Sequence, residues 1–137
     1  MEPTINRKKL SMRLGFVTFF MYFLNTIAVK FYWYSSIWWF DMFMHFLGGV
    51  WVGLILLWVF PSKSLNKNYF MKIILGILAV GLAWEVFEYI FYNTIAQNPF
   101  DLKDTISDIF FDMMGGVVSV FYFSKTIIHI KEIEYNK

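Results

Sequence analysis

Four long apolar runs, separated by short polar or aromatic segments, set the hydrophobic pattern of this chain. They cover about residues 14–30, 41–60, 69–92 and 104–123. A helix that crosses the hydrocarbon core of a bilayer needs about 20 mostly apolar residues, and each run meets or nearly meets that length. The pattern therefore predicts an all-α membrane protein with a single domain over residues 1–137, built as an antiparallel bundle of four transmembrane helices.

The segment between the first two runs, Phe31–Phe40, reads FYWYSSIWWF, in which seven of ten residues are aromatic. Because tryptophan and tyrosine favour the membrane–water interface, this segment predicts an interfacial turn. The start of a long second helix fits the same residues nearly as well, and the sequence leaves that alternative open. The other two connections, Ser62–Asn68 and Asn93–Lys103, are short and polar.

Composition supports the membrane assignment. Charged residues make up 16% of the chain, whereas soluble domains carry about a quarter. We therefore expect membrane lipids, and no nucleic acid, as partners. The basic start followed by an apolar run also fits a signal peptide, but no small-x-small cleavage site follows, so we expect a retained anchor. Cysteine is absent, which excludes disulfides, thiolate metal ligands and a cysteine nucleophile.

The distribution of basic residues predicts an orientation. Four spans place both termini on one side, and ten of the twelve basic residues then fall on that side; only Lys30 and Lys103 fall opposite. Short cytoplasmic segments of membrane proteins are enriched in lysine and arginine. We therefore expect a multi-pass protein of the plasma or inner membrane of the cell, with both termini in the cytoplasm.

Ionisable residues interrupt the last three runs, all at the same predicted end of the bundle, the extracytoplasmic end. The second run begins with Asp41 and His45, spaced i, i+4, and the third ends with Glu85 and Glu88, spaced i, i+3. The fourth opens with an aspartate at every fourth position: Asp104, Asp108 and Asp112. Each spacing places its residues on one helix face, so three helices can present polar faces to a common centre.

Six carboxylates and one imidazole would meet in this centre. Two like charges about 4 Å apart repel by about 4 kcal/mol at an effective dielectric of about 20. The centre must therefore bind cations, hold several protons or open to water. Carboxylates with one imidazole suit a divalent metal ion such as Mg2+, Mn2+, Zn2+, Ca2+ or Fe2+. The candidate catalytic residues are His45 and Glu85, and the candidate metal ligands are Asp41, His45, Glu85, Glu88, Asp104, Asp108 and Asp112.

Structural roles compete with this interpretation for some of these residues. Asp41 and Asp104 could be helix N-caps, which the helix dipole favours, and His45 could simply pair with a neighbouring carboxylate. Such roles do not suit the other four, because two stand at a helix C-terminus, where the dipole disfavours negative charge, and two lie too deep to cap. A shared functional site is therefore favoured for Glu85, Glu88, Asp108 and Asp112.

The glycines of the runs are interpreted as packing positions at which helices approach closely, because none follows a phosphate-loop pattern. They are Gly48, Gly49, Gly53, Gly76, Gly81, Gly115 and Gly116.

The order of these motifs resembles the VanZ-like group of small membrane proteins. That group has Asp-Lys-x-x-His-Phe, a glutamate in the next span, then Asp-x-x-x-Asn-x-x-Gly. The chain matches with Asp41-x-x-x-His45-Phe46 and Asp108-x-x-x-Asp112-x-x-Gly115, but Met42 replaces the lysine and Asp112 replaces the asparagine.

A second resemblance is closer. The run His-Phe-Leu-Gly-Gly from His45, the motif Trp84-Glu85-x-x-Glu88 and the aspartate ladder are similar to a related bacterial inner-membrane family of unknown function, typified by YjdF. The match covers Asp41–Gly116. The VanZ-like group is associated with teicoplanin resistance, and no settled reaction comes with it. The resemblance therefore supports a site without naming an activity.

Three classes of function stay open. The first is a metal-dependent hydrolase or transferase acting on a lipid-linked or phosphorylated substrate at the outer leaflet. The second is a non-catalytic protein that binds a lipid or an antibiotic, or in which an ion only holds the helices together. The third is a cation or proton transporter, which the apolar inner halves of the runs disfavour. We rank them in this order, and a bundle this small is compatible with homo-oligomerisation.

Overall fold

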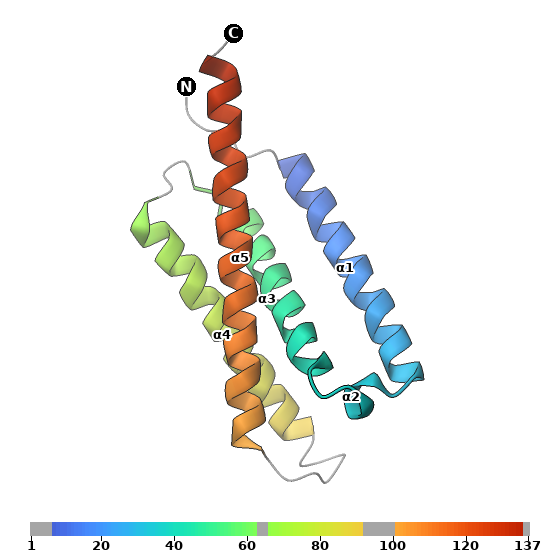
Figure 1. Ribbon diagram of the computed structural model, residues 1–137. Coiled ribbons are helices and arrows are strands. Elements are labelled where there is room, and N and C mark those ends of the chain that lie inside the picture. Colours follow the sequence, from blue (N-terminus) through green and yellow to red (C-terminus); the bar gives the residue numbers. More distant parts are fainter. Residues whose placement is uncertain (1–6, 63–65, 92–100, 136–137) are drawn as a thin grey trace.

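The computed structural model describes residues 7–62, 66–91 and 101–135, and within them the chain forms four long helices and one short one (Figure 1). The long helices run antiparallel to one another in sequence order, and each is long and apolar enough to cross a membrane, the last over Leu102–Phe123. The prediction of an all-α membrane bundle of four antiparallel helices is confirmed. The helices are α1 (Arg7–Lys30), α2 (Trp33–Ser36), α3 (Phe40–Val59), α4 (Lys67–Phe91) and α5 (Leu102–Tyr135).

Two helices are longer than the apolar runs that predict them. α1 begins at Arg7, about two turns before the first run, and α5 continues to Tyr135, beyond the predicted end near Phe123. Neither extension contains glycine or proline, so nothing in the sequence stops the helix where the apolar pattern ends. Of the predicted connections, residues 63–65 and 93–100 lie outside the described residues.

The aromatic segment between α1 and α3 forms a turn, as predicted, and the alternative of one long second helix is wrong. Tyr32 has a left-handed backbone with φ 57°, which ends α1. The hydroxyl of Ser36 donates to the Tyr32 carbonyl at 2.8 Å and holds the single turn of α2. Trp33 and Tyr34 then pack edge-on against Phe40, the first residue of α3, with ring centroids 5.4 and 5.0 Å apart.

The pair α3 and α5 makes the closest helix contact. A Cβ atom on Gly49 would collide with the backbone carbonyl of Asp112, and one on Gly115 would collide with the backbone carbonyl of Phe46. Two helix backbones approach this closely only where side chains are absent. The predicted packing role of these glycines is confirmed, and the contact fixes the register of His45 against the aspartates of α5.

α4 packs on this pair through small residues as well. A Cβ atom on Gly81 would lie 2.9 Å from Oδ2 of Asp112, and Gly116 of α5 faces Ile77 of α4. The buried apolar core lies towards the end of the bundle that holds the start of α1, away from α2. It comprises Leu10, Leu54, Leu57, Tyr69, Ile73, Ile77 and Phe123.

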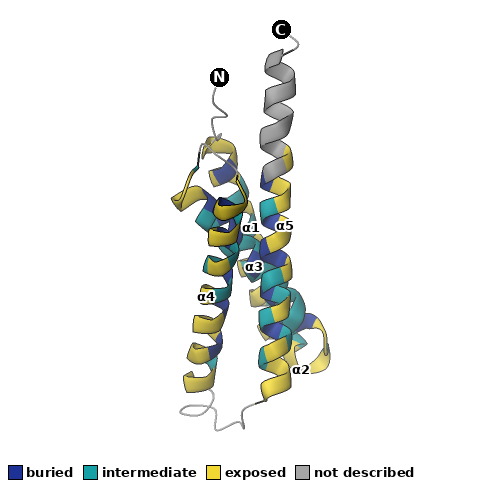
Figure 2. Ribbon diagram, turned by 90° about the vertical axis from the view of Figure 1, so that its left-hand side faces the viewer, coloured by how far each residue is buried: buried dark blue, intermediate teal, exposed yellow. Residues whose placement is uncertain are grey.

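α1 is the peripheral helix. Among the described residues, its backbone approaches only α2 and α3. Trp51 of α3 donates to the Thr18 hydroxyl at 2.7 Å, while Phe16, Phe19 and other large apolar side chains of α1 are exposed. Figure 2 shows how burial is distributed in the bundle: buried residues line the facing sides of α4 and α5, and exposed residues cover their outer sides. Exposed apolar faces of this kind suit contact with lipid.

Candidate metal centre

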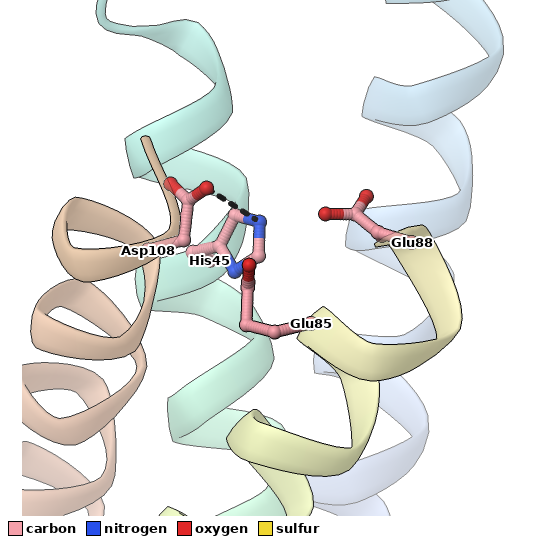
Figure 3. Close-up of side chains that lie close together, drawn as sticks. All are labelled: His45, Glu85, Glu88 and Asp108. Atoms are coloured by element: carbon pink, nitrogen blue, oxygen red, sulfur yellow. Dashed lines mark ion pairs between the residues drawn. The ribbon is translucent and has the colours of Figure 1, made fainter. Parts of the chain in front are cut away.

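Four ionisable side chains from three helices converge near the α2 end of the bundle. His45 extends from α3, Glu85 and Glu88 from α4, and Asp108 from α5 (Figure 3). One ligand atom from each residue lies within 4.8 Å of the others. The spacing of Glu85 and Glu88 places both on the face of α4 that looks towards α3 and α5. We refer to these four residues as the buried ligand group.

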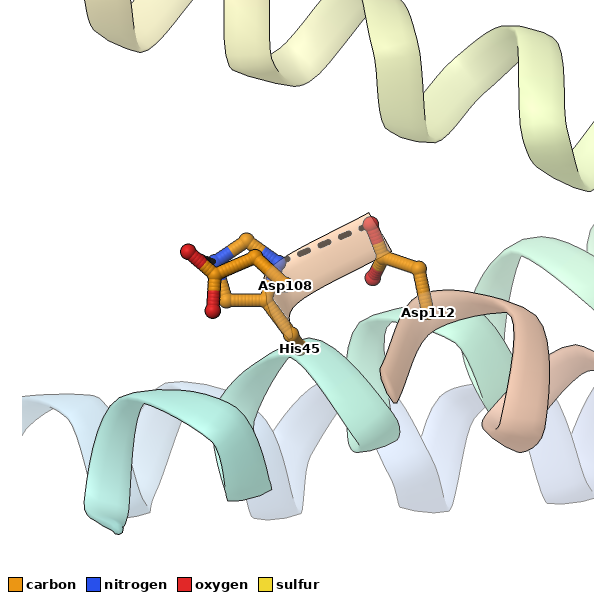
Figure 4. A network of polar contacts seen from close by, with 3 residues as sticks. All are labelled: His45, Asp108 and Asp112. Carbon is orange, nitrogen blue, oxygen red and sulfur yellow. Dashed lines mark ion pairs between the residues drawn. The ribbon is translucent and has the colours of Figure 1, made fainter. Parts of the chain in front are cut away.

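The imidazole of His45 lies between two aspartates of α5 (Figure 4). Its Nε2 is 3.8 Å from Oδ2 of Asp108, and its Nδ1 is 3.5 Å from Oδ2 of Asp112. A histidine that ligates a metal commonly directs its other ring nitrogen to a carboxylate, which fixes the tautomer and the ring orientation. Asp112 occupies that position relative to His45. It is not a member of the buried ligand group.

Two carboxylates of the buried ligand group have a buried oxygen without a partner. Asp108 is 1% exposed and Glu85 is 9% exposed, and neither Oδ1 of Asp108 nor Oε1 of Glu85 makes a hydrogen bond. An unpartnered buried polar atom costs about 1–3 kcal/mol, and more when it is charged. A proton or a bound cation would satisfy each of these oxygens.

A second cluster of possible metal ligands lies beside the buried ligand group. It comprises Asp41 of α3 with Asp104 and Asp108 of α5, again with one oxygen from each within 4.8 Å of the others. Asp41 is partly buried and Asp104 is exposed, so this group is the more accessible one. We refer to it as the outer ligand group. All seven residues proposed from the sequence are therefore accounted for: six in the two groups and Asp112 against the imidazole.

The alternative of N-capping is wrong for both Asp41 and Asp104. The residue that caps α3 is Trp39, which makes no side-chain capping bond. At the start of α5, Oδ1 of Asp101 accepts from the backbone N–H of Lys103 at 2.9 Å, so Asp101 is the cap. Both aspartates nevertheless lie in the first turn of their helices, where the helix dipole favours a carboxylate.

A cavity of about 910 Å³ adjoins the centre. Residues of α1 and α4 face each other across it, and these two helices make no backbone contact in the described residues. Asp41, Glu88 and Asp104 line its acidic part, whereas Met21, Val52 and Val80 line its apolar part. No lysine or arginine lines the cavity among the described residues. The space is therefore amphiphilic and electronegative at one end.

Thr105 is a site residue that the sequence interpretation missed. Its hydroxyl interacts with the carboxylate of Glu85, and the residue lines the cavity. The signal was present, because Thr105 precedes Asp108 by three positions and Asp112 by seven, which places it on the same face of α5. At the rim, Tyr34 donates to the side-chain oxygen of Asn25 at 2.8 Å, which links α2 to α1.

Fold and centre together define a small α-helical membrane protein with a buried acid–histidine cluster. A family model with the description "Predicted membrane protein (DUF2238)" matches residues 3–128, and the chain belongs to this family. The description names neither the VanZ-like nor the YjdF-like family. No curated protein matches the chain, and no solved structure matches it.

Proposed function

We propose that this protein binds a divalent metal ion through the buried ligand group and uses it for hydrolysis or transfer on a lipid-linked or phosphorylated substrate. One observation carries the proposal: four ligand atoms from three helices lie within 4.8 Å of one another, and two of the residues that supply them, Asp108 and Glu85, each have a buried oxygen without a hydrogen-bond partner. A divalent cation in this group would offset the repulsion among the carboxylates.

The donor set indicates which ions fit. Three carboxylates and one imidazole suit Mg2+, Mn2+, Zn2+, Ca2+ or Fe2+, and no thiolate is available in a chain without cysteine. When bound, such an ion would supply a Lewis acid for a phosphoryl oxygen and an activated water. No lysine or arginine lines the cavity among its described residues, so we infer that a phosphate group is held through the ion.

The remaining roles follow from the contacts of each side chain. Asp112 orients His45 through Nδ1, which leaves Nε2 directed at the ligand group. Glu85 belongs to the buried ligand group and also lines the cavity. We propose that it accepts the proton of the attacking water or hydroxyl. We thus propose His45 as a metal ligand and Glu85 as the general acid or base; a general acid or base role for His45 stays a prediction.

The cavity supports an amphiphilic substrate. Its volume of about 910 Å³ lies in the usual range of ligand pockets, about 300–1,000 Å³. The acidic part stands next to the ligand groups, and the apolar part continues between α1 and α4. A lipid-linked molecule would place its polar group at the centre and its chain along the apolar wall. A non-catalytic lipid-binding protein would use the same cavity, and it is the second candidate for that reason.

Orientation and family relations belong to the same proposal. Arg7 and Arg13 stand on the half of α1 that is far from the ligand groups, and Lys67 starts α4 at that same end. Positively charged ends favour the cytoplasm, so we place the centre at the outer face of a bacterial inner membrane. We also propose kinship with the VanZ-like and YjdF-like proteins. Transport is disfavoured, because the other end of the bundle is filled by the apolar core.

The test uses the full chain in lipid nanodiscs that contain phospholipids and a polyprenyl phosphate. Lipids are analysed by mass spectrometry after incubation with Mn2+, Mg2+ or Zn2+. We expect conversion of one lipid class that depends on the ion and is lost in Glu85→Gln. The control is Lys72→Gln, which also neutralises a charge but changes an exposed residue of α4 that belongs to neither ligand group and does not line the cavity. Stoichiometric metal without any lipid conversion would favour the non-catalytic binding protein.

A further inference from the structure

Asp108 is the one residue common to the two ligand groups of the described chain. The buried ligand group joins it to His45, Glu85 and Glu88, and the outer ligand group joins it to Asp41 and Asp104. The two groups therefore adjoin each other and do not form separate sites.

The two oxygens of Asp108 have different surroundings. Oδ2 lies 3.8 Å from Nε2 of His45, in the buried ligand group. Oδ1 is buried and has no hydrogen-bond partner, in a side chain that is the most enclosed of the centre. A carboxylate can bind a different metal ion with each oxygen, and this is how many two-metal sites with ions about 3.5–4 Å apart are bridged.

Charge supports an ion in the outer ligand group as well. Its three carboxylates come from two helices and stand within 4.8 Å of one another, with no lysine or arginine beside them in the cavity lining that the structure describes. Neither Asp41 nor Asp104 is the N-cap of its helix; both lie in the first turn, where the helix dipole favours a carboxylate but does not explain why the two converge with Asp108. Repulsion among them would be relieved by a second divalent cation.

We propose that the protein holds two divalent ions bridged by Asp108, the second bound by Asp41 and Asp104. This inference rests on the proposed function and narrows its substrate class to phosphate esters. Two adjacent ions can stabilise both the attacking and the leaving oxygen of an in-line phosphoryl displacement. Asp41 and Asp104 line the cavity and Asp104 is exposed, so the outer ion is the one that a phosphate reaches first.

The experiment is a titration of the metal-free full chain in detergent with Mn2+, followed by native mass spectrometry and low-temperature electron paramagnetic resonance. For the wild type we expect two Mn2+ per chain and the spectrum of an exchange-coupled pair. For the double variant Asp41→Asn/Asp104→Asn we expect one Mn2+ and the spectrum of an isolated ion. Asp101→Asn should retain two coupled ions, and circular dichroism checks that each variant is folded.

The outcomes separate this inference from the proposed function. One Mn2+ in the wild type, unchanged in the double variant, would overturn the second site and leave the proposed function standing. Two Mn2+ that persist in the double variant, or that show no coupling, would overturn the assignment to Asp41, Asp104 and the Asp108 bridge. No bound Mn2+ in the wild type would overturn the proposed function itself.

Discussion

α3 contacts α5 and α1 in two different ways. Towards α5 the backbones touch at Gly49 and Gly115, so no side chain can adjust to change the distance. Towards α1 the contact depends on side-chain ends, such as the bond from Trp51 to Thr18. The first contact fixes the residues that would hold metal, and the second borders the cavity. The difference teaches that the candidate metal centre and the cavity beside it depend on different helix pairs, which can be perturbed separately.

The largest expected effect comes from breaking the α3–α5 contact. Gly115→Leu would place a side chain against the backbone of Phe46, which cannot move away without separating the helices. We expect a loss of about 3 kcal/mol or more in the free energy of unfolding, at the upper end of overpacking effects. Thermal unfolding in detergent, followed by circular dichroism, measures it.

The matched control for this change is Gly15→Leu in α1, where an added Cβ atom meets nothing within 4 Å. It should unfold at the temperature of the wild type. Equal destabilisation of the two variants would contradict the view that the α3–α5 contact holds the bundle together.

A second change separates stability from metal binding. Asp108→Asn loses the pair with His45 but removes the charge that two groups of carboxylates share, and each close carboxylate pair repels by about 4 kcal/mol at an effective dielectric of about 20, so we expect the metal-free variant to be more stable than the metal-free wild type. Added Mn2+ or Zn2+ should raise the melting temperature of the wild type and leave that of the variant unchanged. Differential scanning fluorimetry without and with metal measures both predicted changes in melting temperature. A variant that metal stabilises as much as the wild type would contradict the role of Asp108.

A third change distinguishes a ligand from an orienting residue. Asp112→Asn keeps the ligand groups intact but alters the carboxylate on Nδ1 of His45, and loss of such a partner lowers metal affinity by roughly 10–100-fold. Glu88→Gln removes a ligand, so we expect a larger loss of affinity. Calorimetric titration with Zn2+ compares the two variants, and the reverse order would assign Asp112 to the metal.

The smallest effect is expected at the α1–α3 contact. Thr18→Val removes the acceptor of the Trp51 hydrogen bond, and such bonds between membrane helices are worth about 0.6 kcal/mol on average. A double-mutant cycle with Trp51→Phe measures the coupling in the free energy of unfolding. Metal affinity should stay at the wild-type value, whereas a large loss of metal would mean that α1 also positions the centre.

The hydrophobic runs were sufficient to predict the four helices and their antiparallel order, because span length and the aromatic turn are local properties of the sequence. They did not predict where α1 begins or α5 ends, since helix propensity continues beyond the apolar residues. The N-cap at Asp101 was missed as well, because a polar connection offers several residues able to cap.

Prediction of the centre shows the same limit. Spacings of three and four residues predicted which face of each of the three helices points to the centre. Such spacings can be read directly from the sequence. The roles within the centre depend on the rotation of α3 against α5 to within one turn, since Asp108 and Asp112 share a face. The backbone contact between Gly49 and Asp112 sets that rotation. From the sequence alone, Gly49 indicates that two helices pack closely, but not which residue of α5 it meets. The cavity lies between α1 and α4, whose backbones make no contact in the described residues. No local sequence pattern indicates that two helices stay apart.

The most direct test of the central claim is elemental analysis of the full chain, purified in detergent, supplied with divalent ions and freed of excess metal. Wild type and Asp101→Asn should each retain divalent metal in stoichiometric amount, and Asp108→Asn should retain none. Absence of metal from the wild type, or the same metal content in Asp108→Asn, would contradict the assignment of this centre as a metal site.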